Sequence, residues 1–375
     1  MRLKQPVLGI VATVLIIGIS FGFISLFSWP TFAGWVSYAI MCAIPTTIVI
    51  GAFWKSEVPV GIARRPQPLS GALYLALAAA LASVVALVHY LTVGGGFSPL
   101  TPVLIQAIIV SVVVAFWLTI MWGGWPFALI QNRVVAGLTL LAGIYLVNAL
   151  LFRIFFSYDF LRGSPAYHAG LDPHGAFNGW NATVFAVTSL SVMFLLAHLD
   201  LWPLTRFPRL MRQPVLGAVW TMIALVLGGG LFLIGTSGLG ISAPVFLVRV
   251  PIPFIFGSVV LLNMLEGSLF ARAAQPLKGL FSTLTAAVLG SLLAFGYTLL
   301  MPVVTGPLAS GGPANDAEIW LANALLAVTF PFLAFHVDLF QRWPLGARAA
   351  DRGAQPQAPV AGRPVDEAGA GTRLG

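Results

Sequence analysis

Two motifs place an imidazole and a carboxylate two residues apart inside strongly apolar stretches of the chain. They are His198-Leu199-Asp200 and His336-Val337-Asp338. Ionisable side chains within a membrane span are costly and usually serve a transport pathway, a proton relay or a partner charge. Because imidazole titrates near neutral pH, these motifs could relay protons. The two imidazoles could also bind a metal or a haem iron.

Helical geometry limits what each motif can do alone. Residues two positions apart lie about 200° apart around a helix axis, so the histidine and the aspartate of one motif point in roughly opposite directions. A histidine from one helix could instead meet the aspartate of the other helix. The structural alternative is that Asp200 and Asp338 form ion pairs with Arg206 and Arg342, which follow them in the sequence.

Three further polar residues fall in one other apolar stretch, at residues 243–266. Asn263 and Glu266 lie at the end of the stretch that corresponds to the His-x-Asp motifs, which predicts a polar ring at one depth. Arg249 precedes Pro251 and Pro253, and two prolines remove backbone donors and favour a broken helix. An arginine at such a break could bind an anionic group or extend to the membrane surface. We therefore predict a solute or ion pathway lined by His198, Asp200, Arg249, Asn263, Glu266, His336 and Asp338.

The elements that must position these residues are membrane-spanning helices. The 375 residues are 59% hydrophobic and 8% charged, whereas soluble domains carry about 25% charged residues. Ten apolar stretches are long enough to cross a bilayer at about 20 residues each. They are residues 7–28, 33–54, 69–92, 101–124, 134–156, 180–201, 214–235, 243–266, 277–301 and 317–340. The sequence therefore predicts an all-α polytopic membrane protein and excludes a water-soluble globule.

Lysine and arginine predict the orientation of these helices, because both residue types collect in cytoplasmic loops. With the N-terminus inside, 16 of the 19 lysines and arginines lie on the cytoplasmic side, and Arg153, Arg162 and Arg249 do not. Both termini are then cytoplasmic. This asymmetry explains the net charge of +8 without a nucleic-acid partner and predicts contact with anionic lipids at the inner face. Residues 349–375, rich in Ala, Gly and Pro, are predicted to form a disordered cytoplasmic tail.

A short motif recurs at the start of every odd-numbered stretch. Its copies are Gln5-Pro6-Val7-Leu8-Gly9, Gln67-Pro68-Leu69-Ser70-Gly71, Arg133-Val134-Val135-Ala136-Gly137, Gln213-Pro214-Val215-Leu216-Gly217 and Gln275-Pro276-Leu277-Lys278-Gly279. Proline suits the first helical turn, and glycine lets a neighbouring backbone approach closely. The recurrence predicts five tandem helical hairpins of one orientation within a transmembrane domain over residues 1–348. They lie near residues 5–62, 67–130, 133–208, 213–272 and 275–345.

The longest loop, residues 157–179, holds His168, Asp172 and His174. These side chains could coordinate a metal on the outer face, but their spacing matches no zinc signature, and a loop that caps the helices is the simpler interpretation. The single cysteine, Cys42, excludes an intramolecular disulfide. The sequence contains no nucleotide-binding or metalloprotease motif, so it predicts no metal, no cofactor and no ATP hydrolysis.

These features favour a multi-pass protein of the bacterial inner membrane that moves a small solute. We expect a permease or channel, either proton-coupled through the histidines and carboxylates or selective for an anionic substrate through Arg249. Two alternatives stay open: a non-transporting subunit or scaffold of a larger membrane complex, and an intramembrane haem or metal redox protein. A homo-oligomer is compatible with each of them.

Overall fold

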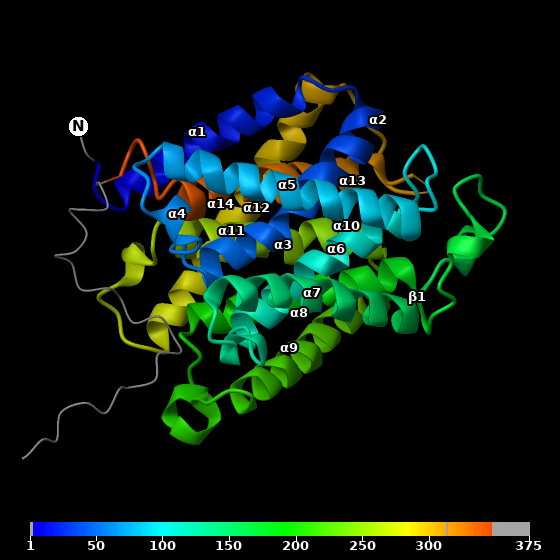
Figure 1. Cartoon of the computed structure of the whole chain (residues 1–375). Helices are drawn as coiled ribbons and strands as arrows, with labels where there is room; N and C mark the ends of the chain where they lie inside the picture. Colours follow the sequence, from blue (N-terminus) through cyan, green and yellow to red (C-terminus); the bar gives the residue numbers. More distant parts are fainter. Residues whose placement is uncertain (1–2, 313, 347–375) are drawn as a thin grey trace, which may run out of the picture.

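Ten helical segments of the computed structural model are long and apolar enough to cross a membrane (Figure 1). The structure describes residues 3–312 and 314–346, so the predicted tail at 349–375 lies outside the described residues. In chain order the spans are Val7–Ile24, Trp29–Phe53, Leu69–Thr92, Pro102–Met121, Arg133–Phe155, Gly179–His198, Val215–Gly238, Ala243–Met264, Leu277–Thr305 and Asp316–Leu339. Their ends lie within four residues of the predicted stretches, which confirms an all-α architecture with ten candidate membrane spans.

Five of the spans are single helices, and the others are divided into pieces. The single helices are α1 (Val7–Ile24), α5 (Leu69–Thr92), α7 (Arg133–Phe155), α8 (Gly179–His198) and α12 (Leu277–Thr305). The second span consists of α2 (Trp29–Thr31), η1 (Phe32–Val36), α3 (Ser37–Ile48) and η2 (Val49–Phe53), and the fourth of α6 (Pro102–Phe116) and η3 (Trp117–Met121). The seventh span consists of α9 (Val215–Leu233) and η9 (Ile234–Gly238), and the eighth of α10 (Ala243–Arg249), α11 (Pro251–Val259) and η10 (Val260–Met264). The tenth span consists of α13 (Asp316–Ala322), η12 (Asn323–Thr329), α14 (Phe330–Ala334) and η13 (Phe335–Leu339). Short helices in the connections are α4 (Val60–Ala63), η4 (Phe127–Leu129), η5 (Asp159–Leu161), η6 (Ala169–Leu171), η7 (Leu204–Arg206), η8 (Pro208–Met211) and η11 (Ser268–Phe270). Four even-numbered spans end in a π-helical turn, namely η2, η3, η10 and η13.

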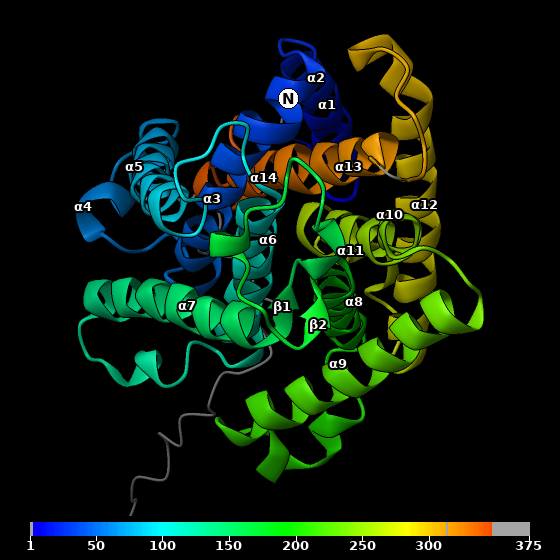
Figure 2. The same ribbon diagram turned by 90° about the vertical axis from the view of Figure 1, so that its right-hand side faces the viewer.

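The spans alternate between buried and exposed positions along the chain. In the most apolar window of each span, between 61% and 72% of the residues are buried in the even-numbered spans and between 22% and 39% in the odd-numbered ones. The even-numbered spans are therefore the inner spans and the odd-numbered ones the outer spans. Figure 2 shows α3, α6, α8, α11 and α14 gathered in the middle, with α1, α5, α7, α9 and α12 around them.

The inner spans form a closed ring in chain order. α3 contacts α6, α6 contacts α8, α8 contacts α11, α11 contacts η12, and η12 returns to α3. Each outer span lies against at least two ring members: α1 on η10 and η12, α5 on α3 and η13, α7 on α6 and η2, α9 on α8 and η3, and α12 on α11, α8 and α13. Since lipid supplies little hydrophobic drive for helix association, close backbone approach and hydrogen bonds must hold these contacts.

Four glutamines join outer spans to inner spans at one end of the bundle. The side-chain oxygen of each glutamine accepts a hydrogen bond from the backbone N–H of the motif glycine four residues later. The side-chain nitrogen donates to a carbonyl at the end of an inner span. The pairs are Gln5 with Met264, Gln67 with Leu339, Gln213 with Met121 and Gln275 with His198. We call this end of the molecule the glutamine end.

The motif copy that lacks glutamine makes a similar junction with other atoms. The side-chain oxygen of Asn132 caps the start of α7, and Nε1 of Trp54, which follows the second span, donates to the carbonyl of Arg133 at 2.7 Å. Glycine is required at the motif positions because atoms of neighbouring spans lie very close to its backbone. A Cβ atom on Gly217, for example, would lie 2.6 Å from Cδ2 of Trp122, so this position excludes a side chain.

Two consecutive residues with positive φ follow every inner span. The pairs are Lys55-Ser56, Gly123-Gly124, Asp200-Leu201, Glu266-Gly267 and Gln341-Arg342, with φ between 48° and 76°. In four of the pairs the N–H of the second residue donates to a carbonyl six residues earlier, which closes the helix end. A left-handed residue other than glycine costs about 1–2 kcal/mol. The sequence alone therefore gives little sign of these turns.

The loop between the fifth and sixth spans lies at the opposite end of the bundle (Figure 1). Its two ends pair as a short parallel sheet of β1 (Phe156–Ser157) and β2 (Phe177–Asn178). Tyr158, next to β1, is fully buried, and its hydroxyl donates to Oε1 of Gln106 in α6 at 2.8 Å. The loop is therefore attached to the inner ring.

Candidate functional site

Two cavities lie within the inner ring, and all five inner spans contribute to the lining of each. The larger cavity has a volume of about 280 Å³ and the smaller one about 80 Å³. Ile44, Phe116 and Phe330 border both cavities and therefore lie between them. The inner spans thus line two spaces in series, separated by apolar side chains.

The larger cavity is polar at the glutamine end and apolar elsewhere. Its charged and amide side chains are Asn263 in η10, Asp338 in η13 and Arg342 in the turn after the tenth span. Among the other lining residues Thr47 alone is polar, and its hydroxyl already donates to the carbonyl of Ala43. The cavity is therefore amphipathic, with its charges gathered at one end.

The carboxylate of Asp338 borders the larger cavity and has no hydrogen-bond or ion-pair partner among residues 3–312 and 314–346. Its backbone carbonyl accepts a hydrogen bond from Oγ of Ser56 at 2.5 Å, which holds η13 against the turn that follows the second span. The side chain lies directly on Gly51, where a Cβ atom would be 2.6 Å from Cγ of Asp338. Gly51 thus leaves the space that this carboxylate occupies.

Arg342 is held by two groups and still has an unused donor. Its Nη2 lies 2.7 Å from Oε1 of Glu266 and donates to the backbone carbonyl of Asn263 at 3.3 Å. Its Nε is buried and has no hydrogen-bond partner within the described part of the chain. The guanidinium is therefore anchored by Glu266 and by the carbonyl of Asn263, and its buried Nε–H group has no acceptor among the described residues.

His198 lies between helices of the wall and does not border either cavity. Its Nδ1 is 2.7 Å from Oγ of Ser282 in α12, and its Nε2 is 3.0 Å from Oγ of Ser258 in α11. Both ring nitrogens are thus occupied by hydroxyl groups, which leaves neither one for an iron or another metal in this arrangement. Asp200 follows α8 and forms an ion pair with Lys278 at 2.7 Å.

The other predicted pathway residues also lie apart from these cavities. Arg249 is exposed at the break between α10 and α11, which agrees with a side chain that extends to the surface. His336 has a buried Nε2 without a partner among the described residues, and it borders neither cavity. Glu266 reaches the larger cavity only through its ion pair with Arg342. Of the seven predicted residues, the structure brings two to the cavity, Asn263 and Asp338.

Several lining residues of the larger cavity give little signal in the sequence. The sequence indicates Arg342 only as an ion-pair partner for Asp338. Its position four residues after Asp338, at the end of an apolar stretch, could have identified it as a residue of the site. Phe116, Phe194 and Phe330 also line this cavity. The chain has 27 phenylalanines, most of them in apolar stretches, so nothing in the sequence distinguishes these three.

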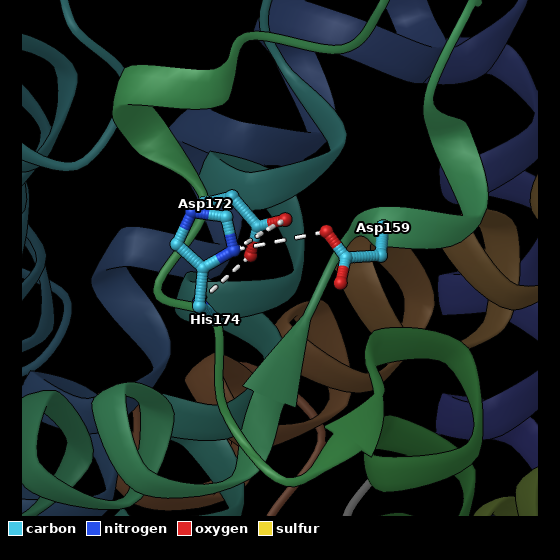
Figure 3. A group of neighbouring side chains, drawn as sticks. All are labelled: Asp159, Asp172 and His174. Atoms are coloured by element: carbon cyan, nitrogen blue, oxygen red, sulfur yellow. Dashed lines mark hydrogen bonds and ion pairs between the residues drawn. The ribbon is translucent and has the colours of Figure 1, made fainter.

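A second group of polar side chains lies in the loop at the opposite end (Figure 3). Asp159, Asp172 and His174 place their ligand atoms within 4.8 Å of one another. The Asp172 side chain is fully buried, and it accepts hydrogen bonds from the backbone N–H groups of Tyr158 and His174 and from the hydroxyl of Tyr167. Its lone pairs are therefore already used within the loop.

The contacts of Tyr158 and Asp172 explain why these polar residues are buried in the loop. Burial, with a smaller contribution from the charge of Asp172, raises the pKa of Tyr158 well above its usual value. Tyr158 therefore stays a neutral donor to Gln106. The predicted grouping with His168 does not form, because His168 stacks on Phe97 with ring centroids 3.9 Å apart. These contacts give the cluster a structural role in the loop.

Comparison of the chain with family models, with curated proteins and with solved structures gives no significant match. The cavities and the charges that border them are therefore the features of the chain that bear on its function.

Proposed function

We propose that the protein is a permease or channel that moves a small solute across the bacterial inner membrane along the axis of the inner ring. One observation carries the proposal: the larger cavity is lined by residues of all five inner spans and holds a carboxylate without a partner among the described residues. Charged groups at membrane depth usually serve a substrate or an ion. A purely structural bundle would instead fill this space with close-packed apolar side chains.

The proposal includes an arrangement of five tandem helical hairpins. Each junction at the glutamine end joins an outer span to the inner span that comes three spans earlier in chain order, with the tenth span counted as preceding the first. The pairs are the first with the eighth, the third with the tenth, the fifth with the second, the seventh with the fourth and the ninth with the sixth span. The left-handed pairs recur after every inner span as well. Both regularities support duplication of one hairpin with its orientation kept.

We place the glutamine end in the cytoplasm, together with both termini. The support is the distribution of lysine and arginine, which includes Lys278 and Arg342 at this end and follows the positive-inside rule. The larger cavity then faces the cytoplasm, and the loop that contains Tyr158 faces outward. The basic inner surface would contact anionic lipid headgroups.

Ile44, Phe116 and Phe330 form the barrier of the proposed route. Ile44 and Phe330 each precede a proline inside an inner span, Pro45 and Pro331. A proline within a helix removes a backbone hydrogen bond and favours bending, so the inner spans can yield at the level of the barrier. Hydrophobic constrictions of this kind gate channels by excluding water. Bending of these spans would join the two cavities.

Solute flux into vesicles tests the route. The purified protein is reconstituted into liposomes, and uptake of small solutes is followed with and without an imposed pH gradient. We expect flux above that of protein-free vesicles and an increase of about tenfold for Phe330→Ala, which corresponds to a barrier lowered by about 1.4 kcal/mol. Phe281→Ala is the control, because it removes the same ring from the exposed face of α12.

Two results would decide between the proposal and its alternatives. If neither the wild-type protein nor Phe330→Ala gives flux above empty vesicles, the ring is not a route for solutes. That result would favour a non-transporting subunit or scaffold of a membrane complex. Uptake that accelerates under an imposed pH gradient would support proton coupling, and loss of that acceleration in Asp338→Asn would assign the coupling to this carboxylate.

A further inference from the structure

The polar end of the larger cavity holds unused hydrogen-bonding groups of both charges. The Asp338 carboxylate and the Nε of Arg342 have no partner within residues 3–312 and 314–346. The side-chain amide of Asn263, which can both donate and accept, has none there either. Asp338 and Asn263 are half-buried and border the cavity, and the Nε of Arg342 is fully buried. Polar groups that border a cavity in a membrane span usually serve a substrate or an ion, so these side chains indicate a ligand site.

The charged groups at this end determine which ligand fits. Asp338 and Glu266 are acidic, Arg342 is basic, and Glu266 is already paired with Arg342 at 2.7 Å. A simple anion could bind Arg342 but would be repelled by the carboxylate of Asp338, which borders the same cavity. A simple cation could pair with Asp338 but would make no attractive contact with the guanidinium of Arg342, which also borders the cavity. A ligand that carries one group of each sign satisfies both.

The remaining walls describe the rest of the ligand. Beyond the polar end, the cavity is lined by apolar side chains that include Phe116, Phe194 and Phe330. Its volume of about 280 Å³ is near the lower limit of small-molecule pockets, which span about 300–1,000 Å³. The walls thus suit one compact apolar substituent and provide no second charged site.

We propose that this cavity binds a small zwitterion. Its ammonium group pairs with Asp338, its anionic group binds Arg342 and Asn263, and an apolar substituent lies against the phenylalanines. An amino acid with a branched aliphatic side chain has this chemistry. The inference deepens the proposed function and rests on it, because it names the class of solute that the route would carry.

Three probes with the same branched apolar substituent test the charge requirement. Leucine carries both charges, 3-methylbutylamine carries only the ammonium group, and 4-methylpentanoate carries only the carboxylate. Binding to the purified protein in detergent is measured by isothermal titration calorimetry. We expect leucine to bind about tenfold more tightly than either single-charge probe, because each of those loses one charge-assisted hydrogen bond.

Two substitutions assign the charges to residues. Asp338→Asn should weaken leucine binding about tenfold and improve binding of 4-methylpentanoate, whereas Arg342→Gln should weaken leucine binding and improve binding of the amine. Asp200→Asn is the matched control, because its carboxylate pairs with Lys278 outside the cavity, and leucine affinity should not change. Melting temperatures are recorded for all variants because Arg342→Gln also removes the ion pair with Glu266. The wild-type probe series does not depend on that variant.

The outcomes separate this inference from the proposed function. Tighter binding of the amine than of leucine would show that the site prefers a cation, and tighter binding of the acid would show that it prefers an anion. Either result, or no binding of any probe, would overturn the inference. In vesicles, flux of other small solutes without flux of leucine refutes the zwitterion alone. The absence of any flux refutes the route itself.

Discussion

Two aspartates at opposite ends of the molecule have opposite surroundings. Asp172, in the loop, accepts hydrogen bonds from two backbone N–H groups and a tyrosine hydroxyl, whereas the Asp338 carboxylate has no partner among the described residues. By residue type, either aspartate could belong to a ligand site. The contacts separate them, because a carboxylate whose lone pairs accept hydrogen bonds stabilises the fold, whereas one without such partners can bind a ligand.

The largest effect on stability is expected at Asp172. Asp172→Ala leaves the N–H groups of Tyr158 and His174 without an acceptor, and each unpaired buried group costs about 1–3 kcal/mol, so the variant should lose about 3 kcal/mol. Denaturant unfolding in detergent measures this loss, and protease cleavage within residues 157–179 should increase. Asp159→Ala is the control, because Asp159 is half exposed and should matter little.

A metal-binding role for this loop makes a different prediction. If a chelator destabilises the wild-type protein as much as Asp172→Ala does, the loop cluster holds an ion and the comparison between the two aspartates fails. We expect the chelator to leave the unfolding curve unchanged, since the hydrogen bonds of Asp172 already occupy its oxygens.

A smaller effect is expected at Tyr158, and it depends on pH. Tyr158→Phe removes the hydrogen bond to Gln106 and should cost about 1 kcal/mol. Because the pKa of Tyr158 is raised in the folded state, its contribution is complete below the ordinary tyrosine pKa of about 10 and is lost as the pH rises above it. Unfolding at neutral pH and near pH 11 should therefore show the wild-type stability falling toward that of the variant. Parallel pH profiles would contradict this interpretation.

The smallest effect on stability is expected at Asp338. Asp338→Asn removes the charge of a carboxylate that has no hydrogen-bond or ion-pair partner in the described part of the chain, so stability should stay constant or rise by about 1 kcal/mol. The same unfolding measurement applies, with Asp172→Asn as the matched substitution at the other end. A loss comparable to that of Asp172→Asn would reveal a structural role for the Asp338 carboxylate.

The positions of the spans could be predicted from the sequence, but their places in the bundle could not. Charged residues, prolines and glycines bound the apolar stretches, which is why the predicted ends lie within four residues of the observed ones. Hydropathy does not distinguish the inner spans from the outer ones. The first and fourth spans share a value of 2.6, yet 39% of one window and 67% of the other are buried. The difference arises from packing between spans distant in sequence.

The candidate site shows the same limit at the level of single residues. Asp200 and Asp338 belong to motifs of identical spacing, so the sequence assigns them one role. In the structure α8 ends at His198 and Asp200 falls in the left-handed turn after it, whereas the π-helical turn of η13 extends to Leu339 and keeps Asp338 within the span. Where each helix stops decides which carboxylate borders the cavity, and propensity does not determine that point.

The hydrogen bond from Gln5 to the carbonyl of Met264 joins groups that are 259 residues apart in the chain. At translation rates of about 5–20 residues per second, the ribosome adds the second of these roughly ten to fifty seconds after the first. The first helix is therefore synthesised long before its acceptor exists. A nascent chain halted short of Met264 would leave this glutamine amide without that acceptor. The first span therefore stays without this contact until the eighth span has been synthesised.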